Sequence, residues 1–445
     1  MKISNFLFAV ISVSITILMP FFIYAQQMPD YTGQVFPSNH ALNMPIDALP
    51  VHTNSNNYVA SIGANTALHP DFGTSWDDEG TIRPMGIPYN VVGNDQPLVP
   101  ITFYLYADES DPGPWPIPQN PYIETVFDWR NLENGDRHML IVDSSSHILY
   151  ETGGVYGNAN GTEWEGGCGA VFNLTSNDLR PETWTSADAA GLPIFPLLIR
   201  YDEVERALLT DGLFHHPIRF TAEVTQRAYI WPARHYASSN TSQNRPPMGL
   251  RFRLKADVDI SGFSPSMQVI LRTMKKYGII VSDNGGNWFF QGTHDDRWDN
   301  DEINSLKSLH GSDFEAVDIS EWMSRPGFDI NSAAVPPAPG TSVMPALNAD
   351  KPDNFILYQN YPNPFNPRTM ISYKLKERSE VALKIFDILG REIAVLVNET
   401  KNAGNYTVEW NGENSLGQKA GSGIYFFRLN SNSGFTSSKK MILIK

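Results

Sequence analysis

Two carboxylates in the middle of the chain have the chemistry that sugar hydrolysis requires. Asp188 lies in a loop of small residues, and Asp202 follows closely, next to Glu203. Glycosidic cleavage commonly uses two carboxyl groups about 5–10 Å apart, one as acid and the other as base or nucleophile. We therefore take Asp188 and Asp202 (or Glu203) as a candidate catalytic pair. The alternative is that Asp188 caps a turn and Asp202 begins a short helix through Leu209.

Another group of carboxylates stands where a predicted strand ends. Asp108 opens the run Asp108-Glu109-Ser110-Asp111, which leads into a Pro-rich loop containing Trp115. Such a run could supply a catalytic acid or bind calcium. The alternative is a solvent-exposed turn, because Asp and Pro are common in turns.

Residues 229–236 combine aromatic rings with a histidine. Read as a strand, this segment places Tyr229, Trp231 and His235 on one face, and Arg234 and Tyr236 on the other. His235 could act as a general base beside rings that stack on sugars, or it could be a core histidine in an aromatic cluster. The expected substrate-binding residues are Trp184, Trp231, Arg234, Tyr236 and Trp288.

Calcium is the one cofactor that the sequence suggests. Asp295, Asp296 and Asp299 crowd one loop and offer the oxygen ligands that calcium prefers, although the loop is out of register with an EF-hand. The alternative to a calcium site is a loop that leads into a helix beginning with Asp. The sequence contains no zinc-binding H-E-x-x-H, dinucleotide fingerprint, phosphate loop or G-x-S-x-G elbow.

The elements that must position these residues read mainly as strands. The clearest are Gly249–Ile260, Val99–Asp108 and Ala228–Ala237, with a hairpin over 138–151. We expect an antiparallel β-sandwich or jelly roll with one or two helices. One helix follows Ser264, a good N-cap, and ends near Gly278; the other runs from about Asp301 to Leu309. If there is one site, Asp188, Asp202, His235 and Asp283 should converge on a cleft lined by Trp.

Charge divides the 445-residue chain into two parts. The formal net charge is −15, made up of −20 over residues 1–350 and +5 over residues 351–445. An acidic domain of this kind is a poor nucleic-acid binder, because phosphates require basic surface. A single cysteine excludes a disulfide framework within the chain.

Residues 1–25 are expected to be a signal peptide. Lys2 precedes an apolar stretch, and Ile23-Tyr24-Ala25 provides a small-residue cleavage site. The alternative is a permanent anchor, since roughly 20 apolar residues can span a bilayer. No other stretch is apolar enough to do so, and we expect no transmembrane segment in the mature chain.

The C-terminal part has the features of an export module. Residues 333–352 form a Pro/Ala/Ser-rich linker, and residues 353–445 contain short β runs typical of a small antiparallel sandwich. The Tyr361–Pro367 motif, "KIFDILGREIAVL", "GIYFFRL" and the terminal "KKMILIK" resemble the type A sorting domain of the type IX secretion system. The resemblance implies transport by that translocon, removal of the domain, and a secreted or surface-attached product.

Residues 26–332 form the cargo of this export module. The stretches "WTSADAAGLPI", "WPARHYAS", "PPMGLRFRLKA" and "YGIIVSDNGGNW" are similar to those of a group of secreted bacterial β-rich proteins. That resemblance supports a single defined domain and implies no mechanism.

The leading functional hypothesis is a secreted polysaccharide-degrading enzyme, a glycoside hydrolase with paired carboxylates. A polysaccharide lyase is the second mechanism, with Arg234 or Arg251 neutralising a uronate while His235 or Tyr236 moves the proton. The rival class is a non-catalytic glycan-binding adhesin. The acidic cargo disfavours an anionic polymer, which favours the hydrolase.

Overall fold

The computed structural model describes residues 26–338 except 79 and, nearer the C-terminus, residues 355–357, 360, 365, 367–415 and 417–443. The predicted signal peptide, most of the linker and most of the Tyr361–Pro367 motif lie outside the described residues. Within these ranges, no helix is both long enough and apolar enough to cross a membrane.

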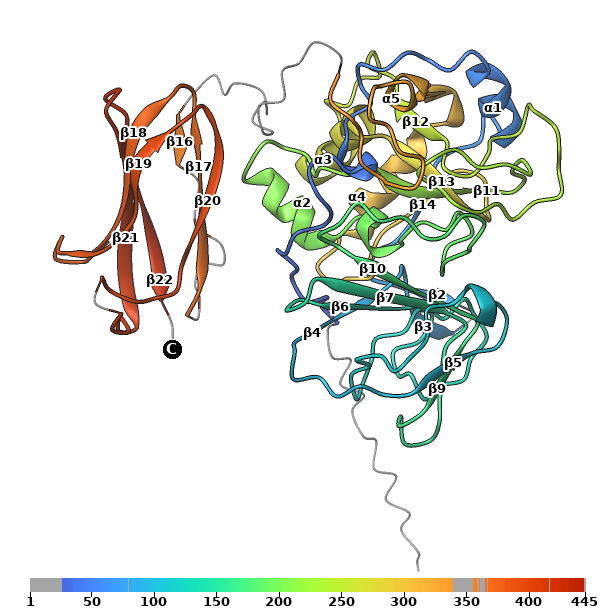
Figure 1. The fold of residues 1–445 in the computed structure, drawn as a ribbon, viewed down its shortest axis with the longest axis horizontal. Helices are drawn as coiled ribbons and strands as arrows, with labels where there is room; N and C mark the ends of the chain where they lie inside the picture. The colour runs from blue at the N-terminus through green and yellow to red at the C-terminus, as the bar shows by residue number, and fades with distance from the viewer. Residues whose placement is uncertain are drawn as a thin grey trace, which may run out of the picture.

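The prediction of a mostly β protein is confirmed (Figure 1). The largest sheet has six strands in the order β1-β14-β11-β13-β12-β15. It is mixed, which corrects the antiparallel arrangement expected for the cargo in this sheet, because β11 runs parallel to β13 and β1 runs parallel to β14. The strands are β1 His69–Asp71, β11 Ile218–Ala222, β12 Arg251–Leu254, β13 Ile279–Asn284, β14 Phe289–Gln291 and β15 Phe314–Ala316.

A second sheet has the order β10-β7-β6-β4. Its strands are β4 Tyr89–Val92, β6 Met139–Asp143, β7 Ile148–Gly153 and β10 Cys168–Asn173. The predicted hairpin is confirmed, since β6 pairs antiparallel with β7. Smaller sheets join β2 Ser75–Asp78 to β3 Thr81–Pro84, and β5 Ile101–Phe103 to β9 Trp164–Gly166 and β8 Tyr156–Gly157.

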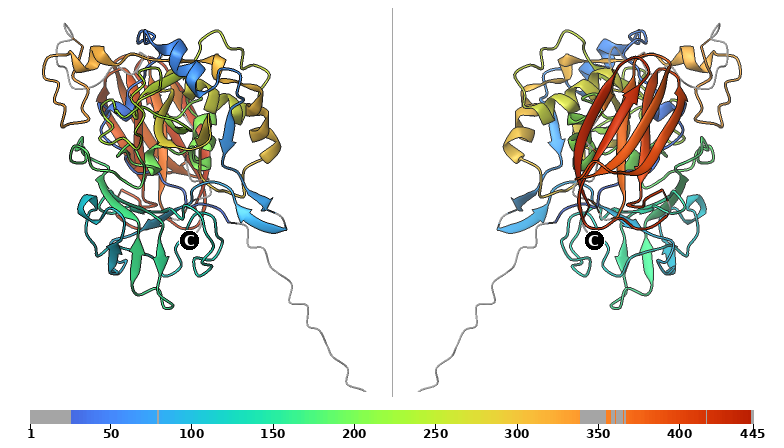
Figure 2. Two further views of the ribbon diagram at one scale, coloured as in Figure 1. Left: turned by 90° about the vertical axis from the view of Figure 1, so that its right-hand side faces the viewer. Right: turned by 90° about the vertical axis from the view of Figure 1, so that its left-hand side faces the viewer.

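The cargo therefore has two lobes that are joined by one shared buried cluster. We call residues 87–174 the hairpin lobe and the rest of 26–338 the helical lobe; Figure 2 shows this division from two further sides. Leu140 and Leu149 of the hairpin lobe belong to the same buried cluster as Ile218 and Phe220 of the helical lobe. A continuous apolar core fixes the two lobes against each other, so side chains at their junction have defined neighbours.

The cargo has more helices than the one or two expected. Its described residues include the α-helices α1 Ser55–Ile62, α2 Tyr201–Leu208, α3 Pro265–Lys276, α4 Asn300–Ser305 and α5 Ser320–Met323. The predicted helix after Ser264 is confirmed as α3, whose first turn is capped by the Ser264 hydroxyl accepting from the Met267 amide. Gly278 follows it with a φ of 76°, as a left-handed stop requires.

Several predicted strands are shorter or absent. The run Gly249–Ile260 forms a strand only over β12, and Val99–Asp108 only over β5. Residues 228–237 are not a strand, because Trp231 and Pro232 form a turn and the Ala233 amide bonds back to the Ile230 carbonyl. Proline lacks the amide donor that a ladder needs, which explains why pairing stops here.

The C-terminal segment forms two antiparallel sheets, β16-β17-β20 and β19-β18-β21-β22, around their own core. The strands are β16 Ile356–Leu357, β17 Thr369–Leu375, β18 Ser379–Asp387, β19 Glu392–Lys401, β20 Gly404–Trp410, β21 Gly423–Ser431 and β22 Thr436–Leu443. This agrees with the small sandwich that the sequence predicts.

Candidate functional site

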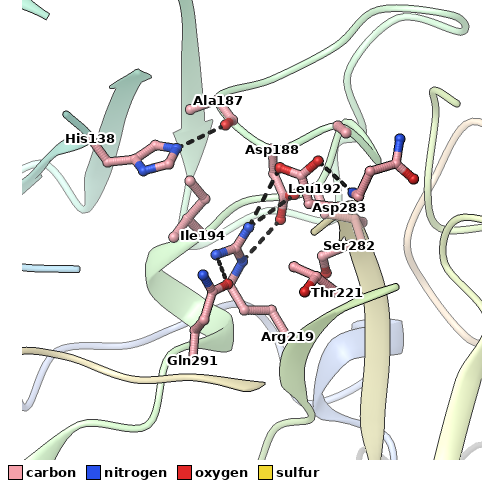
Figure 3. A network of polar contacts seen from close by, with 12 residues as sticks. His138, Ala187, Asp188, Leu192, Ile194, Arg219, Thr221, Ser282, Asp283 and Gln291 are labelled. Atoms are coloured by element: carbon pink, nitrogen blue, oxygen red, sulfur yellow. Dashed lines mark hydrogen bonds and ion pairs between the residues drawn. The ribbon is translucent and has the colours of Figure 1, made fainter. Parts of the chain in front are cut away.

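Two aspartates from distant parts of the chain meet at one arginine (Figure 3). The Nη2 atom of Arg219, on β11, lies 3.2 Å from Oδ1 of Asp188 and 3.9 Å from Oδ2 of Asp283. Nε of Arg219 also donates to Oδ2 of Asp188 at 3.2 Å. Asp283 lies on β13, the parallel neighbour of β11, so the sheet itself places Asp283 beside the arginine.

The two carboxyl groups have different environments. The Asp188 side chain is 0% exposed, whereas that of Asp283 is 30% exposed. Burial raises the pKa of Asp188 to about 7, against the opposing effect of Arg219. Burial also raises the pKa of Asp283, and Arg219 again opposes the shift. Of this pair, only Asp283 reaches solvent and is available to a ligand.

A third aspartate joins the arginine through an amide. Gln291, on β14, accepts a hydrogen bond from Nη1 of Arg219, and its Nε2 donates to Oδ2 of Asp71 at 3.3 Å. Asp71 ends β1 and is half-buried. Burial and the nearby Glu124 raise the pKa of Asp71, while Gln291 and Arg219 lower it. Asp71 is thus a second carboxyl group of the cluster with access to solvent.

A histidine of the hairpin lobe reaches across the lobe junction. Nδ1 of His138 lies 2.6 Å from Oε2 of Glu124, and Nε2 lies 3.3 Å from the carbonyl oxygen of Ala187. Burial lowers the pKa of His138, but Glu124 overcomes this effect and raises it to about 9. Burial alone would raise the pKa of Glu124, yet the neighbouring His138 lowers it overall. The protonated imidazole therefore donates from both nitrogens and holds the loop that carries Asp188.

A row of aromatic rings lies beside this loop. Nδ1 of His235 lies 2.8 Å from the Ala189 carbonyl oxygen. The His235 and Tyr236 rings are 5.8 Å apart at 6°, and the Tyr236 and Tyr229 rings are 6.4 Å apart at 17°. All three residues are half-buried. We call Tyr229, His235 and Tyr236 the ring row.

Backbone contacts place the ring row next to Asp283. The carbonyl of Ala190 accepts from the His235 amide, and the amide of Ala190 donates to the Ser282 carbonyl at 2.9 Å. The Asn284 side chain donates to the carbonyl of Ala237 at 2.5 Å. Asn284 is therefore bonded to one end of the 235–237 segment, and Ser282 is connected to the other end through Ala190.

The structure thus brings together Asp188, His235 and Asp283 and places Asp202 elsewhere. Asp202 lies in α2, buried, where its carboxylate accepts from Arg206 at 2.6 Å and from the Tyr31 amide at 3.1 Å. The alternative interpretation, a short helix beginning near Asp202, is the observed one. Asp108 is exposed in a short 3₁₀ helix over 107–109.

Most of the expected substrate-binding side chains are buried. Trp231 and Trp288 are 2% and 1% exposed, and the Trp288 ring stacks on Phe220 in the core. The Arg234 guanidinium, 3% exposed, donates to the carbonyls of Arg180 and Ile330. Tyr236 and Trp184 are half-buried and so reach the surface.

The arginines of the lyase hypothesis have no access to a substrate in this structure. Arg251 is 1% exposed, and its guanidinium donates to the carbonyls of Ala41 and Tyr277. Arg234 is buried as described above. A uronate group would find neither of these two guanidinium groups at the surface.

The three calcium candidates already have protein partners. Asp295 accepts from the Met28 amide and from Arg297, Asp296 accepts from the Gln26 amide, and Asp299 caps α4. Among the residues that the structure describes, no three His, Cys, Asp or Glu side chains are grouped to hold a metal ion.

Sequence reasoning missed most of the residues that are grouped around Arg219. The residues not identified were Asp71, Glu124, His138, Arg219 and Gln291. One of them had a local signal, because His138 opens the predicted hairpin over 138–151. The other four had none; Gln291 and Asp71, for example, are 220 positions apart.

Comparisons with known proteins concern the C-terminal part. Residues 359–445 match the family model described as the secretion system C-terminal sorting domain. Comparison with curated protein sequences gives no match.

Three solved structures show limited similarity. Dimeric latent PorU from Porphyromonas gingivalis is 24% identical over 20% of this chain and 9% of its own, with a TM-score of 0.18. PorZ, from the type IX secretion system of the same organism, is 22% identical over 22% of this chain and 12% of its own, with a TM-score of 0.16. FlgD from P. aeruginosa is 23% identical over 17% of this chain and 60% of its own, with a TM-score of 0.15.

Proposed function

We propose that the cargo of this chain is a polysaccharide-degrading enzyme. The premise is that the chain carries a type IX sorting domain and is secreted or attached to the outer-membrane surface. The proposed reaction is glycoside hydrolysis at the junction of the two lobes. The observation that carries the proposal is that one nitrogen atom of Arg219 lies close to both the buried Asp188 and Asp283, which reaches solvent. Two carboxyl groups in different environments have different pKa values, which allows one site to supply both an acid and a base.

The proposed roles follow from exposure. Asp283 is the general acid, because it reaches solvent and burial raises its pKa above that of a free carboxyl group. Asp71 is the second carboxyl group, which activates water or attacks the sugar, and Gln291 connects it to the same arginine. Asp188 and Arg219 are positioning residues, since neither side chain is more than 2% exposed.

The ring row supports a sugar substrate. Tyr229 and Tyr236 have half-buried, nearly parallel rings, and ring faces of this kind pack well against the apolar faces of sugars. His235 belongs to this row, and its Nδ1 atom is engaged by the Ala189 carbonyl.

Turnover of neutral polysaccharides tests the proposal. The full chain is incubated with a panel of glucans, xylans and mannans, and reducing ends are counted. We expect Asp283→Asn and Asp71→Asn each to lower kcat by about 100-fold or more on the polymer that the wild type degrades. Asp257→Asn is the matched control, because Asp257 is exposed between β12 and α3.

The second candidate function is glycan binding without turnover, and the ring row is the observation that favours it. If the wild type releases no reducing ends from any polymer yet binds one of them through Tyr236, the adhesin is correct and the hydrolase is rejected. Retained full activity in both Asn variants would also reject the assigned residues.

A further inference from the structure

We infer that the loop of residues 294–297 is a binding site for the amino terminus of the mature chain. The ligand is the ammonium group that Gln26 acquires when the predicted signal peptide, residues 1–25, is removed. Its counter-ion is the carboxylate of Asp296. The inference concerns maturation of the cargo and does not depend on the proposed hydrolysis.

The first residues of the cargo are held on this loop by specific contacts. The Asp296 amide donates to the Gln26 carbonyl at 3.0 Å, and the Met28 amide donates to Oδ2 of Asp295 at 3.1 Å. Nη2 of Arg297 donates to the Met28 carbonyl at 3.2 Å. The Met28 side chain is 3% exposed and belongs to the buried cluster that joins the two lobes. Gln26 therefore has a defined position, two residues from a core anchor.

The backbone nitrogen of Gln26 faces a carboxylate. In the precursor this nitrogen is an amide, which donates to Oδ2 of Asp296. Hydrolysis of the peptide bond between Ala25 and Gln26 places a hydroxyl on the Ala25 carbonyl carbon and a proton on the Gln26 nitrogen, and the amine takes a further proton from solvent. The same nitrogen then carries a positive charge beside the same carboxylate. A hydrogen bond of the precursor thus becomes an ion pair of the mature chain.

Among the residues that the structure describes, no lysine or arginine forms an ion pair with Asp296. The neighbouring Arg297 is engaged by Asp295 at 2.7 Å and by Asp30 at 3.2 Å. Nε2 of His294 lies 3.7 Å from Oδ1 of Asp296, but burial lowers the pKa of His294 and keeps the imidazole neutral. The amino terminus would therefore be the cation that this carboxylate lacks.

Unpartnered polar atoms at this site favour a ligand with more donors. Oε1 of Gln26 and both ring nitrogens of His294 are buried without a hydrogen-bond partner. The His294 side chain is 0% exposed and lies against the Asp296 carboxylate. Buried polar atoms without partners cost free energy. An ammonium group has three donors where the precursor amide has one, so cleavage adds donors to a site that has spare acceptors.

Melting curves of two chains that differ by one residue test the inference. One chain comprises residues 26–445 and the other residues 25–445, so the additional Ala25 moves the ammonium group off the Gln26 nitrogen. Both are released from a carrier protein by a protease that leaves no residue behind. At pH 6 we expect the chain that begins at Gln26 to melt about 2 °C higher, as a partly exposed ion pair in a domain of this size implies.

The difference between the two chains should depend on pH. An α-amine titrates near pH 7.7–8.0 in a free chain, and a nearby carboxylate favours its charged form. The stabilisation is therefore fully present below about pH 7.7 and is lost at higher pH as the amine loses its proton. At about pH 10 the two chains should melt within about 0.5 °C of each other. The other charged or titratable groups at the site, Asp30, Asp295, His294 and Arg297, are the same in both chains.

Substitution of Asp296 connects the difference to its carboxylate. When both chains carry Asp296→Asn, the additional Ala25 should no longer change the melting temperature. Asp257→Asn is the matched control and should leave the difference between the two chains intact.

Mass spectrometry of the exported protein checks the position of the cut, and we expect Gln26 as the first residue with a free amine. Equal melting temperatures of the two chains at pH 6 would overturn the inference. A difference that persists at pH 10 or with Asp296→Asn would overturn it too, because neither leaves the ion pair in place. An exported protein that begins at another residue, or whose amine is blocked, would also overturn it.

Discussion

Asp188 and Asp283 each direct a carboxylate oxygen at the same atom, Nη2 of Arg219, from distances of 3.2 and 3.9 Å. The Asp188 side chain is fully buried, whereas that of Asp283 reaches solvent. The site is thus a buried ion pair with one carboxylate at its outer edge. Its position between two lobes is a common one for ligand sites.

The first prediction concerns the buried member of the pair. Asp188→Asn should lower the free energy of unfolding by about 3 kcal/mol, because it leaves the Arg219 charge buried without its closest anion. Urea denaturation measures this change. Asp257→Asn, which removes an exposed carboxylate, should change stability by less than about 0.5 kcal/mol. Equal stability of the Asp188 variant and the wild type would show that the ion pair is not needed for folding.

The second prediction concerns pH and His138. The folded-state pKa of His138 is raised from 6.5 to about 9, so protonation of this side chain stabilises the fold. That stabilisation is fully present below about pH 6.5 and is lost as the pH rises through about 9. Glu124 and Asp136 favour the charged imidazole, and burial and Arg219 oppose it.

His138→Gln should therefore lose more stability at about pH 6 than at about pH 10, by up to about 3 kcal/mol. The comparison is between melting curves of the variant and the wild type at each pH, so the titration of other groups largely cancels. A stability difference that does not change with pH would contradict the assignment of a charged His138.

The third prediction concerns the ring row. Tyr236→Ala should weaken binding of the preferred glycan about fivefold to tenfold, because it removes the central ring of the row. Tyr236→Phe keeps the ring and should bind within about twofold of the wild type. Affinity electrophoresis in glycan-containing gels compares the two variants. An equal loss in both would point to the hydroxyl group rather than to the ring face.

The fourth prediction concerns export. A chain that ends at residue 338 lacks the sorting domain that matches over 359–445 and should accumulate in the periplasm. Cell fractionation with antibody detection measures its distribution. Recovery of the truncated cargo outside the cell, in the amount seen for the full chain, would show that export needs no part of the domain.

The sequence predicted the features that local signals determine. The hairpin of β6 and β7 and the helix α3 were found because alternation, a Ser264 cap and a Gly278 stop all lie within a few residues of one another. The prediction of a strand over residues 228–237 was wrong. The chain turns at Pro232, and Tyr229 makes a single bridge to Met248 rather than a ladder.

The site could be predicted only in part for a related reason. Asp188 stood out as a lone carboxylate among small residues, but its partner Arg219 looked like any strand residue. The contact that makes His138 relevant runs to Ala187 across the lobe junction. Such pairings depend on how the sheets pack, which no local pattern encodes.

Turnover by Asp283→Asn, measured beside Asp257→Asn, tests the central claim most directly. Both variants remove one negative charge, and only Asp283 lies at the junction of the lobes. On the polymer that the wild type degrades best, we predict a fall in kcat of about 100-fold or more for Asp283→Asn and none for Asp257→Asn. Wild-type kcat in a folded Asp283→Asn protein would contradict the account.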